Sequence, residues 1–173
     1  KVYTGKDQTW VPEVKDAKGN VLDSSCYTVT YDKDDRTNVT GKINVTIKGA
    51  KDYKGEVTKT YQIIKCPVTL KSASLEKVYD GTALVNGDTA LETEEGWAEG
   101  EGATYSFTGT QTNAGSSKNA FTYTLKDNTK EGNYSITKKE GTLTVTPKSI
   151  VPDGPDTPEE KKTGITVTKP SDS

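Results

Sequence analysis

The sequence predicts an all-β protein made of two small tandem Ig-like or β-sandwich-type repeat domains joined by a short linker. Three observations support this prediction. Threonine, valine, tyrosine and isoleucine, which suit a pleated and half-buried surface, are frequent, and 16 glycines supply turns. Apolar and polar residues alternate in several short runs. A five-residue motif recurs 76 residues further along the chain. Since 30% of the residues are hydrophobic and 28% are charged, two thin cores are more plausible than one large core.

The internal repeat rests on three landmarks that recur in the same order. Each earlier segment has a later counterpart: Lys1-Val2-Tyr3-Thr4-Gly5 and Lys77-Val78-Tyr79-Asp80-Gly81, Asn38-Val39-Thr40-Gly41 and Asn113-Ala114-Gly115, Lys51-Asp52-Tyr53 and Gly132-Asn133-Tyr134. The order makes chance unconvincing as an explanation. We therefore expect homologous β domains at residues 1–66 and 67–150.

Period-2 alternation predicts the individual strands. The alternating runs are Tyr27–Tyr31, Lys42–Lys48, Thr58–Ile63, Tyr105–Phe107, Phe121–Leu125 and Thr142–Val145, and Gln8–Val14 is expected to be a further strand. Turn signals lie between them, such as Lys18-Gly19-Asn20 and Glu140-Gly141. Ala90–Gly100 is the one short helix candidate. Antiparallel sandwiches or similar small β folds account for strands at this spacing.

The landmarks resemble a known family. The Tyr-Thr-Gly and Tyr-Asp-Gly openings, the mid-domain asparagine–glycine motifs and the late aromatic before the closing strand are similar to bacterial MBG/YDG-type repeats. Those repeats are Ig-like, mostly-β modules of cell-surface adhesins. The resemblance extends to about Ile150. It implies a cell-surface repeat and carries over no catalytic residue.

The end of the sequence predicts a further strand. Residues 151–163 are rich in proline and charge, which is typical of a semi-extended linker. Residues 164–173 follow as the first strand of a further repeat, because Ile165–Lys169 aligns with Val68–Ser72 at the start of domain 2. Domain 1 then lacks its opening strand. We expect the open flank to permit head-to-tail self-association through Ile165–Lys169 by strand addition.

Two cysteines, Cys26 and Cys66, bracket the second part of domain 1. A disulfide between them is a natural expectation for an extracellular protein. Closing a loop of this length would stabilise the domain by roughly 4 kcal/mol in the chain-entropy model. Two free thiols are the alternative, and alkylation without reductant distinguishes the two states by mass.

Carboxylate clusters offer two further hypotheses. Asp32-Lys33-Asp34-Asp35 contains oxygen ligands for Ca²⁺, but it lacks the glycine and terminal glutamate of the twelve-residue calcium loop, so a solvated turn is preferred. Five glutamates form an acidic run in domain 2: Glu92, Glu94, Glu95, Glu99 and Glu101. A glycosidase would need two of them facing each other across a cleft. A solvated insertion is the preferred reading, and we predict no metal site.

Aromatic residues are the remaining binding candidates. Trp10 lies in a predicted strand, where core packing is the usual fate of a tryptophan. Trp97 lies in the least regular segment and is the candidate ligand contact. Lysine and asparagine side chains are numerous, but no motif frames an isopeptide bond between them, so an intact mass lower by one ammonia is not expected.

Composition bears on the class of function. The chain has no histidine, so the commonest general base is missing, and the interspersed charges sum to −2 with no basic patch. We expect no enzyme, no cofactor, no nucleic-acid partner and no membrane insertion. The expected function is a stalk repeat of an extracellular bacterial cell-surface adhesin, attached to the cell wall through regions outside this segment. The alternative is an adhesive module for host glycan, mucin or protein, and the other expected partners are neighbouring repeats.

Overall fold

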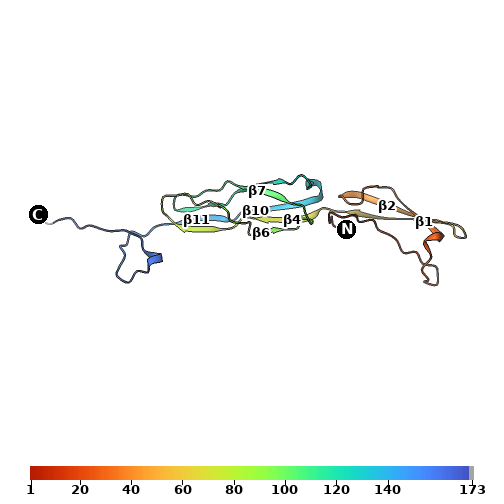
Figure 1. Cartoon of the computed structure of the whole chain (residues 1–173), viewed down its shortest axis with the longest axis horizontal. Coiled ribbons are helices and arrows are strands. Elements are labelled where there is room, and N and C mark those ends of the chain that lie inside the picture. The colour runs from red at the N-terminus through yellow and green to blue at the C-terminus, as the bar shows by residue number, and fades with distance from the viewer. Residues whose placement is uncertain (172–173) are drawn as a thin grey trace. The chain divides into compact units, whose positions relative to one another are not determined.

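A computed structural model describes residues 1–171 and confirms that the protein is all-β (Figure 1). Within residues 1–171, strands and isolated β-bridges make up 39%, and the helical content is limited to short 3-10 turns. The strands are β1 (Tyr27–Tyr31), β2 (Thr40–Gly49), β3 (Glu56–Ile63), β4 (Cys66–Lys71), β5 (Leu75–Val78), β6 (Thr93–Glu95), β7 (Ala103–Phe107), β8 (Gly115–Lys118), β9 (Phe121–Leu125), β10 (Tyr134–Lys139) and β11 (Thr142–Thr146). The 3-10 turns are η1 (Ser24–Cys26), η2 (Glu131–Asn133) and η3 (Glu159–Lys161).

Contacts divide the chain into two compact units. Unit 1 comprises residues 1–70, 94–104 and 123–138, and unit 2 comprises residues 71–93, 105–122 and 139–173. These limits fall within strands β4, β6, β7, β9 and β10. The domains expected from the internal sequence repeat, residues 1–66 and 67–150, are defined by sequence similarity, whereas these units are defined by contacts. The expected domain boundaries therefore stay a prediction.

Unit 1 contains an antiparallel sheet in the order β1-β2-β3. Val29 pairs with Ile47 and Tyr31 with Val45, so the apolar residues of both runs lie on the same face of the sheet. Ile43 and Val45 are fully buried. A second sheet has the order β10-β4-β6 and buries alternate residues of β4, Val68 and Leu70.

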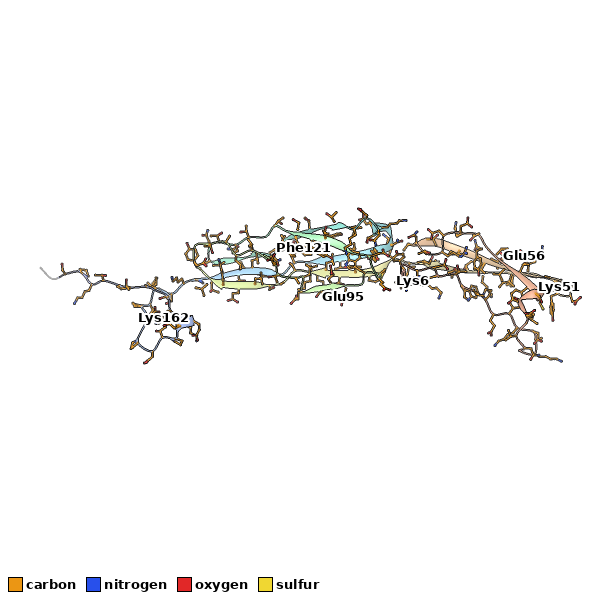
Figure 2. The ribbon with its side chains drawn as sticks, in the orientation of Figure 1. Lys6, Lys51, Glu56, Glu95, Phe121 and Lys162 are labelled. Carbon is orange, nitrogen blue, oxygen red and sulfur yellow. The ribbon has the colours of Figure 1, made fainter. Side chains whose placement is uncertain are left out.

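Unit 2 is built on a sheet in the order β5-β11-β8, in which β11 runs parallel to β5 and antiparallel to β8. Leu143 and Val145 of β11 are buried, and Phe121, at the start of β9, is 1% exposed (Figure 2). A buried polar pair accompanies this core, because the Ser72 hydroxyl donates to the Asn119 carbonyl oxygen at 2.7 Å. Strands β7 and β9 pair in a separate two-stranded sheet.

Two local predictions were wrong. Gln8–Val14 forms no strand, because its polar groups bond to side chains: the Tyr61 hydroxyl donates to the Gln8 carbonyl oxygen at 2.9 Å. Ala90–Gly100 forms no helix and instead contains β6, which ends where Gly96 adopts a φ of +107°. The turn at Lys18-Gly19 is confirmed by a φ of +84° at Gly19.

The segment after Ile150 forms a closed loop instead of a semi-extended linker. The Asp153 carboxylate accepts the backbone N–H groups of Thr163 at 2.9 Å and Gly164 at 3.1 Å. These hydrogen bonds bring the two ends of the loop together around the short η3 turn. The predicted strand at residues 164–173 has no regular secondary structure up to Ser171, and residues 172–173 lie outside the described residues.

Candidate functional site

One polar arrangement in unit 1 joins two tyrosines through one carboxylate. The Tyr3 hydroxyl donates to Glu101 Oε2 at 2.7 Å, and the Tyr134 hydroxyl donates to Glu101 Oε1 at 2.9 Å. Tyr3 is 6% exposed and Tyr134 is 2% exposed, whereas Glu101 is half-buried. We call these three residues the tyrosine–carboxylate cluster. It links parts of the chain that lie 98 and 33 residues apart.

Backbone hydrogen bonds position each member of the cluster. The Tyr3 N–H donates to the Ile64 carbonyl oxygen at 2.9 Å, which fixes Tyr3 beside the end of β3. Gly5 then allows close approach, because a Cβ at this position would lie 2.8 Å from Glu101 Oε2 and 3.1 Å from the Ala98 Cβ. The Ala98 N–H donates to the Tyr134 hydroxyl at 3.1 Å. The cluster is therefore held by main chain on both sides.

Aromatic and amide side chains surround the cluster. The Tyr134 ring meets the Tyr3 ring edge-on at 5.4 Å between centroids and the Trp97 ring at 4.9 Å. Such edge-to-face pairs stabilise a packed state beyond their buried area. Asn133 is 3% exposed; its Oδ1 accepts the Val39 N–H and its Nδ2 donates to Asn38 Oδ1, both at 2.9 Å. The asparagine of the second landmark thus contacts the asparagine of the third.

Burial and the neighbouring carboxylate keep both phenols protonated. Burial, together with the hydrogen bond to Glu101, raises the pKa of Tyr3 to about 12. Burial is also the main cause of the raised pKa of Tyr134. Protonated hydroxyls at neutral pH act as hydrogen-bond donors and not as nucleophiles or bases. The chemistry of this cluster is suited to holding chain segments together.

Removing the shared acceptor is expected to destabilise unit 1. Glu101→Ala should lower the free energy of unfolding by about 2–4 kcal/mol, because two buried hydroxyls lose a charged partner. Glu99→Ala is the matched control, because its contact with Lys6, at 3.7 Å, joins two strongly exposed side chains and contributes little. Urea unfolding followed by the fluorescence of the two tryptophans, which both lie in unit 1, measures both variants. Equal losses in the two variants would contradict the role of the cluster.

High pH is expected to weaken the same cluster. The pKa of Tyr3 is near 10 in the unfolded chain and about 12 in the folded one. Its contribution to the free energy of unfolding is therefore complete below pH 10 and is lost as the pH rises to 12. Absorbance at 295 nm should show that Tyr3 and Tyr134, of the nine tyrosines, ionise at a higher pH than the usual value near 10. Tyr3→Phe should remove one late-titrating group. Ionisation of every tyrosine near pH 10 in the native protein would refute this.

The two cysteines carry free thiols in the structure, so the expected disulfide is not formed there. They have different surroundings. Cys26 ends η1 and lines a hollow beside β1, whereas Cys66 Sγ contacts the Gly96 carbonyl oxygen at 3.2 Å. Burial raises the pKa of the Cys66 thiol. Pairing of the two cysteines stays a prediction for alkylation to test.

The tryptophans both pack against tyrosines. Trp97, the candidate ligand contact, is half-buried against Tyr134 and belongs to the surroundings of the cluster. Trp10 meets the ring of Tyr61 at 6.3 Å, and its carbonyl oxygen accepts the Tyr31 hydroxyl at 2.6 Å. Each ring therefore already has an aromatic neighbour.

The carboxylates of the Asp32–Asp35 turn bond to their own chain. Asp32 Oδ1 accepts the Asn44 N–H at 2.7 Å, and Asp35 Oδ1 accepts the N–H groups of Thr37 and Asn38 at 3.0 Å. The Asn38 N–H is the main cause of the low pKa of Asp35, about 2. Within residues 1–171, no group of three cysteine or acidic side chains is arranged to hold a metal ion.

Glu101 was missed by the sequence analysis as a functional residue. It lay within the acidic run that was interpreted as solvated, and the exposed side chains of Glu94, Glu95 and Glu99 fit that interpretation. The pattern of charges does not distinguish Glu101 from its neighbours. Glycines on both sides, Gly100 and Gly102, were the available sign of an unusual backbone conformation there, and Gly100 has a φ of +78°.

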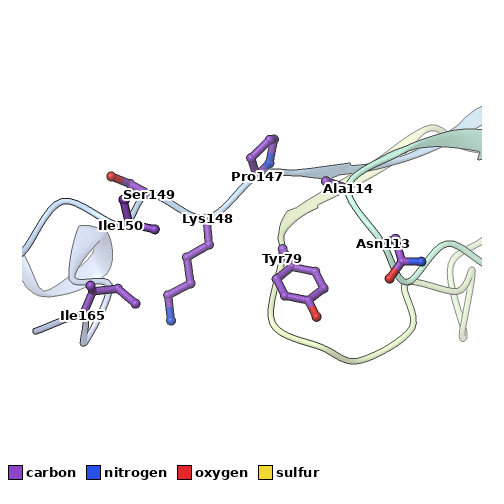
Figure 3. A pocket seen from close by; sticks show the side chains of 8 residues that line it. All are labelled: Tyr79, Asn113, Ala114, Pro147, Lys148, Ser149, Ile150 and Ile165. Carbon is purple, nitrogen blue, oxygen red and sulfur yellow. The ribbon is translucent and has the colours of Figure 1, made fainter. Parts of the chain in front are cut away.

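Unit 2 has its own hollow of about 500 Å³ (Figure 3). Tyr79, which is 41% exposed, lines it together with Asn113, Pro147, Ile150 and Ile165. Tyr79 and Asn113 belong to the first and second sequence landmarks. Their counterparts in the first half of the chain, Tyr3 and Asn38, contribute to the tyrosine–carboxylate cluster and its surroundings.

Across the described part of the chain, no helix is both long and apolar enough to cross a membrane. Comparisons with protein-family models, with curated proteins and with solved structures found no match to this chain.

Proposed function

We propose that this chain is a structural stalk repeat of a bacterial cell-surface adhesin, which spaces or presents a binding region outside the cell. In this proposal the chain contains two tandem Ig-like repeats of the MBG/YDG type. The tyrosine–carboxylate cluster carries the proposal. It joins Tyr3 of the first proposed repeat to Glu101 and Tyr134 of the second by the hydrogen bonds of two buried tyrosines.

Recurring backbone geometry supports the tandem repeat. Three backbone hydrogen bonds of the first half recur in the second half, each with its N–H donor 76 residues further along the chain. The pairs are Tyr3 N to Ile64 O and Tyr79 N to Thr146 O; Ala50 N to Cys26 O and Lys126 N to Gly102 O; Asp32 N to Asn44 O and Thr108 N to Ala120 O. Gly5 and Gly81 also share a φ near +80°. Similar main-chain bonds at a fixed spacing are expected of homologous domains.

A stalk must resist bending where one repeat meets the next. Relative motion is the ordinary expectation for neighbouring domains with a small polar contact. Here the Glu101 carboxylate binds the hydroxyls of Tyr3 and Tyr134, whose rings also meet edge-on. Asn133 adds a hydrogen bond from the Val39 N–H, so several groups of the two proposed repeats are fixed to each other. Repeat arrays gain reach by adding units, provided that each unit is fixed to its neighbour. The chemistry of the cluster suits this requirement better than it suits catalysis.

Spacing and binding can be separated by displaying a known carbohydrate-binding domain on cells with zero, one or three copies of this chain beneath it. A stalk should increase capture of a large glycan-coated particle with copy number, and Glu101→Ala should reduce this gain while Glu99→Ala should not. The chain displayed alone should capture neither mucin-coated nor host-cell surfaces. Saturable capture by the chain alone, with no effect of copy number on a fused head, would instead support the adhesive-module alternative.

A further inference from the structure

The cluster in unit 1 has an incomplete counterpart in unit 2. Tyr79 corresponds to Tyr3, because its N–H donates to the Thr146 carbonyl oxygen at 2.8 Å as that of Tyr3 does to Ile64. The side chains differ in environment, since Tyr3 is 6% exposed and Tyr79 is 41% exposed. Tyr79 borders the open hollow of Figure 3. Unit 2 thus presents a tyrosine in the position from which Tyr3 binds Glu101.

Unit 1 also has a surface that corresponds to the part of the cluster around Glu101, which accepts the Tyr3 hydroxyl. The Cys26 carbonyl oxygen accepts the Ala50 N–H as the Gly102 carbonyl oxygen accepts the Lys126 N–H, both at 2.9 Å, so Ser25 occupies the position of Glu101. Next to Ser25 is a hollow of about 240 Å³. Its lining includes Val14, Leu22, Cys26, Tyr27, Ile47, Tyr53 and Val57. Tyr53 is 46% exposed, so an aromatic ring is available to a docking side chain.

Strand β3 also has a free edge along this surface. Within residues 1–171, β2 is the strand that pairs with β3, residues 1–3 lie beside the C-terminal end of β3, and the side chains from Glu56 to Thr60 are exposed. In the second half of the chain, β10 directly precedes the last strand, β11. Strand β10 has β4 beside it, and β4 buries Val68 and Leu70. The hollow lined by Val57 lies against the edge of β3 where a strand of the β4 kind would place its apolar side chains.

A second segment with the same alternation of apolar and polar residues as β4 lies near the end of the chain. Ile165-Thr166-Val167-Thr168-Lys169 repeats the alternation of Val68-Thr69-Leu70-Lys71-Ser72, has no secondary structure, and exposes 73% of Val167. The Asp153 hydrogen bonds close the preceding loop, so residues 154–163 add little distance between Val151 and Gly164. This brings the segment close, along the chain, to the end of β11. In the first half of the chain β4 likewise follows shortly after Ile64.

We propose that a second copy of the chain docks head to tail on the first through these two matched surfaces. Ile165–Lys169 of one copy adds as a strand to the β3 edge of the other and places Ile165 and Val167 over the Val57 hollow. Tyr79 of the first copy then packs beside Ser25, Leu22 and Tyr53 of the second. This contact repeats between copies the arrangement in which Tyr3 lies against Glu101 within one chain.

The copy-to-copy contact is weaker than the internal one for a specific reason. Ser25 is a short neutral side chain in the position where Glu101 accepts two phenols. A charged acceptor forms the stronger hydrogen bond, so this contact lacks its main polar stabilisation. Because the two surfaces differ, the contact is heterologous and can continue from copy to copy. Association should therefore rise steadily with concentration instead of stopping at a dimer.

The donor segment is tested with the full 173-residue chain by sedimentation equilibrium from micromolar to millimolar concentration. The average mass should rise above the 18.7 kDa of one chain. The double variant Ile165→Lys/Val167→Lys should weaken association at least 10-fold. Thr166→Lys/Thr168→Lys adds the same charge to the other face of the segment and should change it less than about 3-fold. All four positions lie on an irregular segment, so the variants should fold normally.

The receiving surface is tested by restoring the missing acceptor. Ser25→Glu should strengthen association at least 5-fold, and the additional Tyr79→Phe change should remove the gain. Ser24→Glu, on the neighbouring exposed residue, carries the same charge and should not strengthen association. A strictly monomeric wild-type chain at millimolar concentration would overturn the proposal, and so would equal effects of the two lysine pairs. No gain from Ser25→Glu, or an equal gain from Ser24→Glu, would overturn the docking of Tyr79.

Discussion

Gly96→Ala is expected to lower the free energy of unfolding of unit 1 by about 3–5 kcal/mol. Gly96 has a φ of +107°, a conformation that residues with a Cβ rarely adopt. An added Cβ would also overlap the Pro67 carbonyl oxygen and lie 2.9 Å from Val68 Cα. Both atoms belong to the main chain of β4, so no side-chain movement relieves the clash. The backbone of β4 or of the β6 end must move, which disturbs the burial of Val68.

Gly100→Ala separates strain from overlap. Gly100 has a positive φ of +78°, but an added Cβ would meet no atom within 4 Å. Its cost should be the conformational penalty alone, about 1–2 kcal/mol. Urea unfolding monitored by the fluorescence of Trp97, which follows Gly96 in sequence, measures both variants. Equal costs in the two alanine variants would show that β4 does not approach Gly96 as the structure has it.

Strands with strict alternation were predictable from the sequence because a period of two depends on the strand alone. The run Lys42–Lys48 lies within β2 with Ile43 and Val45 buried, and Tyr27–Tyr31 is β1. Pairing between distant strands was not predictable in this way. Nothing local in Leu75–Val78 shows that it runs parallel to β11, because that register depends on contacts 68 residues apart.

The third sequence landmark illustrates how insertions mislead a motif comparison. Lys51-Asp52-Tyr53 was matched with Gly132-Asn133-Tyr134 by residue type. The Tyr53 N–H donates to the Ala50 carbonyl oxygen, and the equivalent turn bond joins Thr129 to Lys126. Tyr53 therefore corresponds to Thr129 in backbone position. The second half of the chain has extra residues around η2, and these carry Asn133 to the surroundings of the cluster.

The cluster itself could be predicted only in part. Tyr3 and Tyr134 stand in recurring motifs, and this marked them as structurally important. Their acceptor, Glu101, lay in a run of glutamates whose other members are exposed. A carboxylate becomes a functional group here because it is close to two buried phenols. That proximity arises from tertiary contacts over 98 residues, and no local pattern encodes it.

Phe121→Ala is expected to be the most damaging single change in unit 2, with a loss of about 3–5 kcal/mol. Phe121 is 1% exposed, and its ring lies 5.7 Å from that of Phe107 and 6.2 Å from that of Tyr105. Removing the ring leaves a cavity and two aromatic rings without their shared neighbour. Such a loss is a large part of the 5–15 kcal/mol that typically stabilises a folded domain.

Two comparisons make the Phe121 prediction specific to packing. Phe121→Leu keeps most of the apolar volume and should cost less than half as much as the alanine change. Thr122→Ala, on the exposed face of the same strand, should change the stability by no more than about 0.5 kcal/mol. Hydrogen exchange of the β11 amides reports on unit 2, since both tryptophans, Trp10 and Trp97, lie in unit 1. Faster exchange in the alanine variant alone is expected. Unchanged protection would mean that the Leu143–Val145 core forms without the Phe121 ring.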